Sequence, residues 1–101
     1  MRMMLFFDLP VVSSTDRHYY NVFHRYLIRN GFLMLQESVY SKLVLNPTAA
    51  NAVLANLRKN KPPAGLIQVL CITENQFSRC EYIIGDFSSE IIDSDERLVV
   101  L

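Results

Sequence analysis

The sequence contains little of what zinc proteins, disulfide-stabilised proteins and nucleotide-binding enzymes depend on. Among its 101 residues there are two cysteines, three glycines and no tryptophan. Cys71 and Cys80 show no CxxC spacing and have no histidine nearby, so we expect two buried thiols instead of a zinc site or a disulfide. A glycine-rich phosphate loop, an HExxH pattern and a Ser/His/Asp constellation are all missing, which excludes several common enzyme classes.

Long apolar runs are also missing from the chain. No segment approaches the roughly twenty apolar residues that a membrane-spanning helix needs. The N-terminal apolar run reaches Asp8 too soon for a signal peptide. Because half of the residues are hydrophobic, we expect one compact domain with a core. We therefore expect a cytoplasmic protein that makes no contact with a membrane.

Charge of one sign is scarce in each part of the chain, although the formal net charge is zero. From Met1 to Lys61 there are eight Lys or Arg and three acids, and from Pro62 onward there are two Arg and seven acids. The first part can offer a basic surface to a polyanion, and the second can offer an acidic surface to a basic partner.

A regular succession of elements begins at the N-terminus. The apolar stretch "RMMLFFD" predicts a buried strand, which Pro10 terminates. The sequence "SSTD" offers N-cap residues for a helix that Asn30 and Gly31 end. The apolar residues of this helix recur at helical spacing. They predict a core-facing stripe of Tyr19, Val22, Phe23, Tyr26 and Leu27.

The middle of the chain continues the alternation of strands and helices. The stretch "FLMLQESVYSKLVL" predicts one bent strand or a tight pair of strands. Asn46 and Pro47 then open a second helix as N-cap and first helical residue. The expected core stripe of this helix is Ala50, Val53, Leu54 and Leu57. The next stretch, "LIQVLCIT", is apolar on both faces and predicts another buried strand.

The last third of the sequence is less regular. Thr73 and Gln76 have the spacing of a capping box, so a short helical turn is expected there. "CEYIIG" predicts a further short strand. The chain then becomes acidic and closes on the apolar "RLVVL", which we expect to add as a strand to the edge of a sheet, its own or a partner's.

This order of elements predicts the fold. Strand, helix, strand pair, helix and strand form an α+β, ferredoxin-like βαββαβ sandwich with extra C-terminal strands. We expect residues 1–85 to form the core, and residues 86–101 to form an acidic linker and a C-terminal strand. The pattern alone predicts no function, because many functions use this fold.

Four stretches together resemble one family. They are the first strand ending in Asp8, "NGFLMLQESVYSKL", "CITENQF" and "DERLVVL". In this combination the chain resembles the CRISPR-associated Cas2 family over nearly its whole length. "LQESVYSKLVLN" and "SDERLVV" are most similar to the branch found in type II-A systems.

The resemblance implies a homodimer placed between two dimers of the Cas1 integrase. Such a complex captures double-stranded prespacer DNA and inserts it into the CRISPR array as a new spacer. The dimer is then a scaffold, while the integrase performs strand transfer. Some family members are also described as magnesium-dependent nucleases that act on RNA or DNA, so an endonuclease is the alternative function.

Asp8 matches the family's acidic position at the end of the first strand. Taken alone, the residue is better explained as an acid that caps a turn before Pro10. Mg²⁺ is usually bound through one or two carboxylates and several waters. One chain offers a single aspartate here, whereas a two-fold dimer could offer an Asp8 pair that a Mg²⁺ ion bridges or adjoins. Any catalytic or metal-binding role therefore predicts a dimer.

The first helix carries candidates for nucleic-acid binding. Arg17, His24 and Arg25 lie on its polar face, and Lys42 can widen the basic surface. Contacts of such residues with phosphates are insensitive to base sequence, as a protein that accepts any spacer requires. The alternative is an ordinary solvated face. Relatives outside this branch often carry a basic residue where this chain has Met34, which argues against a contact at that position.

Two segments are expected to contact a partner. "SVYSKL", with Ser38 and Tyr40, is predicted to be a sheet edge and dimer contact. In the family the C-terminal strand helps to link the dimer, and the tail engages the integrase. The residues expected to do so here are Arg97, Leu98, Val99 and Val100. A small-ligand regulatory domain is a third possibility that the pattern permits, but we find no binding loop for it.

Overall fold

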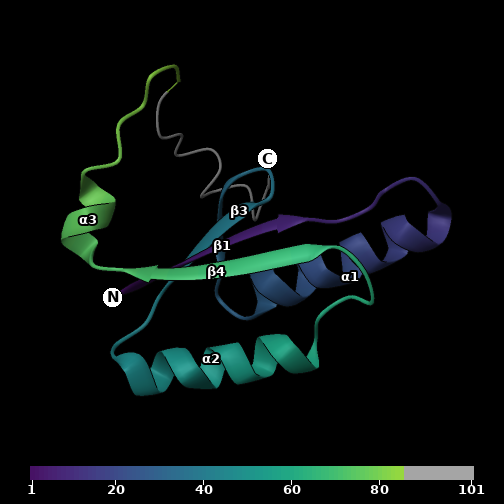
Figure 1. Cartoon of the computed structure of the whole chain (residues 1–101), viewed down its shortest axis with the longest axis horizontal. Helices are drawn as coiled ribbons and strands as arrows, with labels where there is room; N and C mark the ends of the chain where they lie inside the picture. Colours follow the sequence, from purple (N-terminus) through teal and green to yellow (C-terminus); the bar gives the residue numbers. More distant parts are fainter. Residues whose placement is uncertain (86–101) are drawn as a thin grey trace.

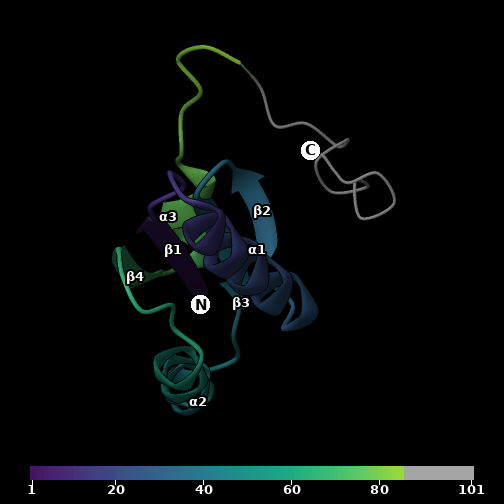
Figure 2. The ribbon, with the colours of Figure 1, turned by 90° about the vertical axis from the view of Figure 1, so that its right-hand side faces the viewer.

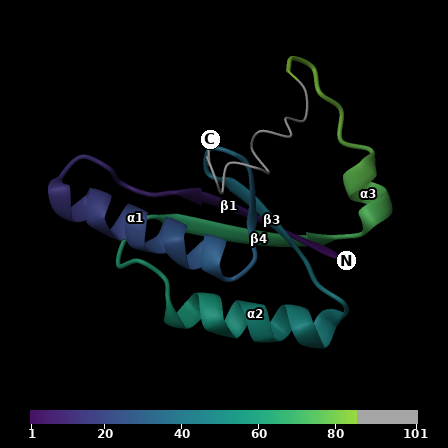
Figure 3. The same cartoon turned by 180° about the vertical axis from the view of Figure 1, so that it is seen from behind.

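The computed structural model describes residues 1–85, in which one four-stranded antiparallel sheet has the order β2-β3-β1-β4 (Figure 1). The elements are β1 (Arg2–Asp8), α1 (Ser14–Arg29), β2 (Leu33–Gln36), β3 (Val39–Leu43), α2 (Pro47–Lys59), β4 (Leu66–Ile72) and α3 (Glu74–Ser78). Seen from behind, α1 and α2 lie on the same side of the strands (Figure 3). This arrangement is a ferredoxin-like fold, as the element order predicts.

Local capping signals fix where the helices begin. Ser13 caps α1 through a reciprocal capping box with Asp16, and Asn46 caps α2 just before Pro47. Thr73 and Gln76 form the capping box of α3. Each cap satisfies backbone N–H groups that the first helical turn leaves unpaired. These starts, the strand over residues 2–8 and the strand pair β2–β3 confirm the predictions from sequence.

The core lies between the sheet and the two long helices. Met3, Leu5 and Phe7 alternate along β1, point toward the helices and are at most 7% exposed. Phe23 and Leu27 of α1 are fully buried against them. The stripe predicted for α2 is confirmed, because its residues are buried or pack against the core clusters: Ala50, Val53, Leu54 and Leu57. We call the covered side of the sheet the inner face and the opposite side the outer face.

The predicted stripe of α1 is wrong at two positions. Tyr19 and Val22 are each 41% exposed, whereas Tyr20 packs against the core. The rings of Phe7 and Tyr20 pack in a T-shaped arrangement, with 5.7 Å between their centroids. Tyr20 and Phe23 lie three residues apart and therefore share a helix face, and this face is turned toward β1.

The strand β4 is less buried than its sequence predicts. None of its residues is buried, and Leu66 and Leu70 are 56% and 55% exposed. The reason is its position at the edge of the sheet, with its outer face uncovered by α1 or α2. The expected sheet edge at "SVYSKL" is also wrong, because β3 lies between β2 and β1.

Two predictions for residues 71–85 are wrong. Cys71 and Cys80 are exposed free thiols. Residues 80–85 form no strand, and Ile83 and Ile84 are 87% and 92% exposed. A strand needs a neighbour to bond its backbone, and this segment pairs with none of the strands in residues 1–85. No helix in the same range is both long and apolar enough to cross a membrane.

Candidate functional site

The outer face of the sheet holds the first candidate site. Arg2, Met4, Phe6 and Asp8 alternate with the core residues of β1, so they point away from α1 and α2. Directly paired residues of neighbouring strands point to the same side. The residues of β3 and β4 that pair with them on this face are Val39, Ser41, Leu43, Leu66, Gln68, Leu70 and Ile72. Asp8 therefore stands at one end of a largely apolar surface.

Asp8 is the last residue of β1 and is exposed. It pairs with Leu66 of the neighbouring strand β4. The two residues lie beside a shallow hollow of about 110 Å³ that Phe6 and Gln68 also line. The Asp8 carboxylate has no hydrogen bond or ion pair with other residues in 1–85. The turn before Pro10 thus takes no cap from this side chain in the described structure, and its carboxylate oxygens remain available to a ligand.

Gly65, the last residue of the loop before β4, lies against the end of β1. Its φ of +110° is one that a residue with a side chain rarely adopts. A Cβ atom at this position would lie 2.8 Å from the Asp8 carbonyl oxygen and 2.6 Å from Cδ2 of Leu9. The position of Asp8 therefore depends on a glycine at residue 65.

A metal site needs more ligands than one chain supplies here. Residues 1–85 contain no group of three or more His, Cys, Asp or Glu that could hold an ion. Asp8 can contribute one carboxylate. Because Mg²⁺ commonly keeps several waters and binds one or two carboxylates, an Asp8 pair from two chains would be a chemically suitable donor set. The donors of a single chain do not suffice.

The predicted nucleic-acid-binding cations differ in what they already contact. Nη1 of Arg17 donates to the carbonyls of Val11 and Val12, at 3.3 and 2.9 Å. Nζ of Lys42 donates to the carbonyl of Asn30 at 2.8 Å, at the end of α1 where a cation complements the helix dipole. Arg25 is exposed and has no such partner within residues 1–85. Of the three, Arg25 is therefore the most available to a phosphate.

His24 does not lie on an open polar face. Its Nδ1 is 2.6 Å from the hydroxyl oxygen of Tyr40, whose side chain is only 1% exposed. Partial burial and the nearby charge of Arg25 lower the pKa of His24, so the ring is neutral at pH 7. Burial raises the pKa of Tyr40, and its hydroxyl stays protonated. A neutral imidazole is no phosphate-binding cation.

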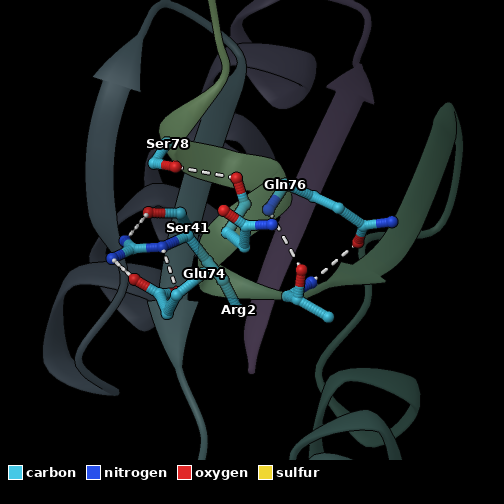
Figure 4. A network of polar contacts seen from close by, with 7 residues as sticks. Arg2, Ser41, Glu74, Gln76 and Ser78 are labelled. Atoms are coloured by element: carbon cyan, nitrogen blue, oxygen red, sulfur yellow. Dashed lines mark hydrogen bonds and ion pairs between the residues drawn. The ribbon is translucent and has the colours of Figure 1, made fainter.

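Sequence reasoning missed a polar network at the other end of the outer face. Arg2 forms a bidentate pair with Glu74 of α3, with both N–O distances 2.9 Å, and donates to the Ser41 hydroxyl at 3.1 Å (Figure 4). Its guanidinium carbon lies 4.1 Å from the centre of the Phe77 ring. The only signal in the sequence is the charge of Arg2, which stands between Met1 and the apolar stretch "MMLFF".

The structure does not bring the predicted site residues together in one chain. Asp8 lies on the outer face, whereas Arg17, His24 and Arg25 lie on α1, which covers the inner face. Ser38 is in the turn between β2 and β3, with a φ of +67°, and its carbonyl accepts from the Phe7 amide. Its contact with a partner, and that of the buried Tyr40, stay predictions. The remaining contact residues lie outside the described part of the chain: Arg97, Leu98, Val99 and Val100.

Comparisons with known proteins agree on one family. The family model described as "CRISPR associated protein Cas2" matches residues 1–80. A CRISPR-associated endoribonuclease Cas2 of Treponema denticola is 54% identical over 101 residues and covers all of both chains. A protein of the same name from Streptococcus mutans is 46% identical over 101 residues, covering all of this chain and 93% of the relative. That of Lacticaseibacillus rhamnosus is 39% identical over the full length of both. The chain belongs to the Cas2 family of CRISPR-associated proteins.

Proposed function

We propose that this protein is a homodimeric scaffold in spacer acquisition, which binds prespacer DNA and bridges Cas1 integrase dimers. The observation that carries the proposal is the outer face of the sheet, an apolar surface that α1 and α2 leave uncovered. Membership of the Cas2 family supports the role in CRISPR systems. The work would take place in the cytoplasm.

The outer face supports a second copy of this chain as the dimer partner. Leu43, Leu66 and Leu70 are between 55% and 59% exposed there, and Phe6 is 37% exposed. An exposed apolar surface of this kind is typical of an interaction site. A two-fold dimer makes such a surface self-complementary and leaves two equivalent sides free, as bridging two integrase dimers requires.

Self-association can be tested by placing a charge on the outer face. We expect Phe6→Asp to shift the protein from dimer to monomer in sedimentation analysis, because the dimer would bury a carboxylate. Val22→Asp adds the same charge at a 41% exposed side chain of α1, on the other side of the sheet, and should leave the dimer intact. A Phe6→Asp protein that remains dimeric would contradict this interface.

The basic side chains of α1 support DNA binding by phosphate contacts. Such contacts do not depend on base sequence and weaken steeply as salt rises. Arg25 is the exposed candidate, whereas Arg17 also bonds the backbone before α1. We therefore expect Arg25→Ala to lower duplex affinity and to flatten its salt dependence. Lys59→Ala, in the last turn of α2, is the matched control at another exposed cation.

An integration assay with the partner integrase tests the scaffold role as a whole. The variants to compare with wild type are Asp8→Asn and the double change Arg17→Ala/Arg25→Ala. We expect integration to persist in the first and to be lost in the second. Loss of integration in Asp8→Asn, with dimer and DNA binding intact, would overturn a purely structural role.

The second candidate is a magnesium-dependent endonuclease that uses Asp8 of both protomers. It is favoured by the exposed Asp8 carboxylate at the rim of the proposed dimer face, and by the name endoribonuclease that the relatives carry. The bound ion would supply activation of a water and neutralisation of phosphate charge. Asp8 would hold the ion, and Gly65 would keep the Asp8 backbone in place.

Cleavage by the purified dimer tests this candidate directly. RNA and double-stranded DNA are each incubated with Mg²⁺ and wild-type or Asp8→Asn protein. We expect any cleavage to depend on Asp8. Equal rates in both proteins would eliminate the Asp8 pair as the catalytic group.

A further inference from the structure

A groove with both polar and apolar lining lies on the helix side of the molecule, away from Asp8. It runs between α1 and the β2–β3 hairpin and has a volume of about 470 Å³. Its lining residues are Tyr20, Asn21, His24, Met34, Glu37 and Tyr40. Figure 2 shows α1 beside β2, the two elements that form its walls. The proposed scaffold and nuclease roles leave this groove without a function.

The floor of the groove is held rigidly. The Tyr40 ring stacks on Phe7 of the core, with 5.6 Å between centroids, and its hydroxyl meets Nδ1 of His24. When the Tyr40 hydroxyl donates this bond, the single proton of the neutral imidazole is on Nε2. Nε2 has no partner within residues 1–85, so it is a donor available to a ligand.

Glu37 gives the groove its acceptor. The carboxylate is exposed, and residues 1–85 offer it no ion pair. Its negative charge is near enough to contribute to the raised pKa values of Tyr20 and Tyr40, after burial. The walls therefore combine a carboxylate acceptor, an imidazole donor and the side-chain amide of Asn21 with the half-buried side chains of Tyr20 and Met34. The Tyr40 ring is 1% exposed and supports the groove from below.

This combination is chemically suited to a flat ring that carries an amine. Aromatic side chains stack on bases, and polar groups read the base edge when a base is unpaired. Glu37 would repel a phosphate but can accept from the exocyclic amine of cytosine, as carboxylates do. Arg25 follows His24 directly on α1, and it can contact the phosphate beside such a base. Thymine and uracil have no exocyclic amine.

We propose that the groove between α1 and the β2–β3 hairpin binds one unpaired, amine-bearing nucleobase of a nucleic-acid strand. This site is separate from Asp8 and adds base recognition to the proposed scaffold, whose duplex contacts are independent of sequence. Arg25 belongs to both surfaces, and Glu37 and His24 belong to the groove.

Two short oligonucleotides with identical backbones test the groove. The four-nucleotide strands dC4 and dT4 differ on the base edge and in the thymine methyl group. Cytosine carries an exocyclic amine and an N3 acceptor, whereas thymine carries a carbonyl oxygen and an N3–H. Binding is followed by the NMR signals of the His24 ring, which His18→Gln distinguishes because the chain has two histidines. We expect dC4 to shift these signals and to bind about fivefold to tenfold more tightly than dT4. Equal affinities, or no shift of the His24 signals, would overturn the proposal.

Substitution of the carboxylate identifies the acceptor. Glu37→Gln keeps the side-chain size and should reduce the preference for dC4 to less than about twofold. Glu81→Gln, on the exposed segment after α3, is the matched control and should keep the preference. A preference that survives in Glu37→Gln would overturn the assignment of Glu37.

Two further ligands distinguish the proposed base site from a free-nucleotide site and from the duplex binding of the proposed scaffold. The free nucleotide dCMP should bind more weakly than dC4. Equal binding would overturn the proposal that the ligand is a nucleic-acid strand and would indicate a nucleotide site. A blunt duplex, in which every base is paired, tests the proposed scaffold alone. If Glu37→Gln loses the dC4 preference and keeps duplex affinity, the groove is supported, whereas parallel loss of both would overturn a separate base site.

Discussion

The two faces of β1 are both apolar in the middle of the strand, and they differ in what covers them. Met3, Leu5 and Phe7 face α1 and α2 and are nearly inaccessible, whereas Phe6, between two of them, is 37% exposed. The inner set is apolar throughout, and the outer set is apolar at Met4 and Phe6, between the charged Arg2 and Asp8. The inner set is covered by helices of the same chain, and the outer set by nothing in residues 1–85 except α3 at the Arg2 end. Hydrophobicity shows which residues favour burial but not which molecule covers them.

The largest effect should come from truncating one side chain on each face of β1, Leu5 on the inner face and Phe6 on the outer face. Leu5→Ala removes a fully buried side chain, and we expect it to lower the free energy of unfolding by about 2–5 kcal/mol. Phe6→Ala should cost less in dilute protein, and its cost should grow with protein concentration, because its partner surface is a second chain. Urea unfolding at two protein concentrations measures both. If both variants lost the same free energy of unfolding at both protein concentrations, the outer face would not be covered by a second chain.

This difference also explains what the sequence could predict. Helix starts depend on a few adjacent residues, so Ser13, Asn46 and Thr73 located them. The exposure of β4 and of Cys71 depends on what lies over the sheet. The apolar pattern of "LIQVLCIT" is the same whether the cover is a helix of this chain or another protein, so burial was overestimated there.

The candidate site was predictable only where one residue was enough. The sequence predicts the place of Asp8 at the end of an apolar strand, and its role as a ligand stays a prediction from the family resemblance. The His24–Tyr40 contact joins residues 16 apart, and the Arg2–Glu74 pair joins residues 72 apart. No spacing rule connects such positions, because their contact results from the packing of α1 on the sheet and of α3 beside β1.

A second, smaller effect is expected where the loop before β4 meets the end of β1. Gly65→Ala places a Cβ against the Asp8 carbonyl and a side chain at positive φ, which we expect to cost about 1–3 kcal/mol. Gly85→Ala is the matched control. It has a φ of +89° but no atom within 4 Å of the added Cβ, so it measures the backbone strain alone.

Thermal unfolding of the two glycine variants gives the comparison. Gly65→Ala should be the less stable, and the NMR signals of Asp8 and Leu9 should move in it alone. Equal stabilities would mean that the close approach to β1 contributes nothing beyond the strained φ.

The smallest effect concerns the Arg2 end of the outer face, which α3 covers within residues 1–85. Hydrogen bonds from Arg2 lower the pKa of Glu74 below the ordinary value of a glutamate, about 4.3. A carboxyl with a lowered pKa stabilises the folded state above its unfolded pKa, and this contribution is lost as pH falls through the folded pKa. Because Glu74 is solvent-exposed, the change should stay local to α3.

The ring of Phe77 reports on this contact, because the Arg2 guanidinium lies over it. We expect its NMR signals to move as the pH falls below about 4.3, the ordinary glutamate value, while those of Leu5 on the inner face stay fixed. Glu74→Gln should abolish this titration, and Glu81→Gln should keep it. A midpoint at or above the ordinary value would contradict the Arg2–Glu74 pair. If the midpoint lies below the ordinary value, acidification loosens α3 from the outer face and leaves the core undisturbed. The contact of α3 depends on an ion pair, whereas the core depends on apolar packing.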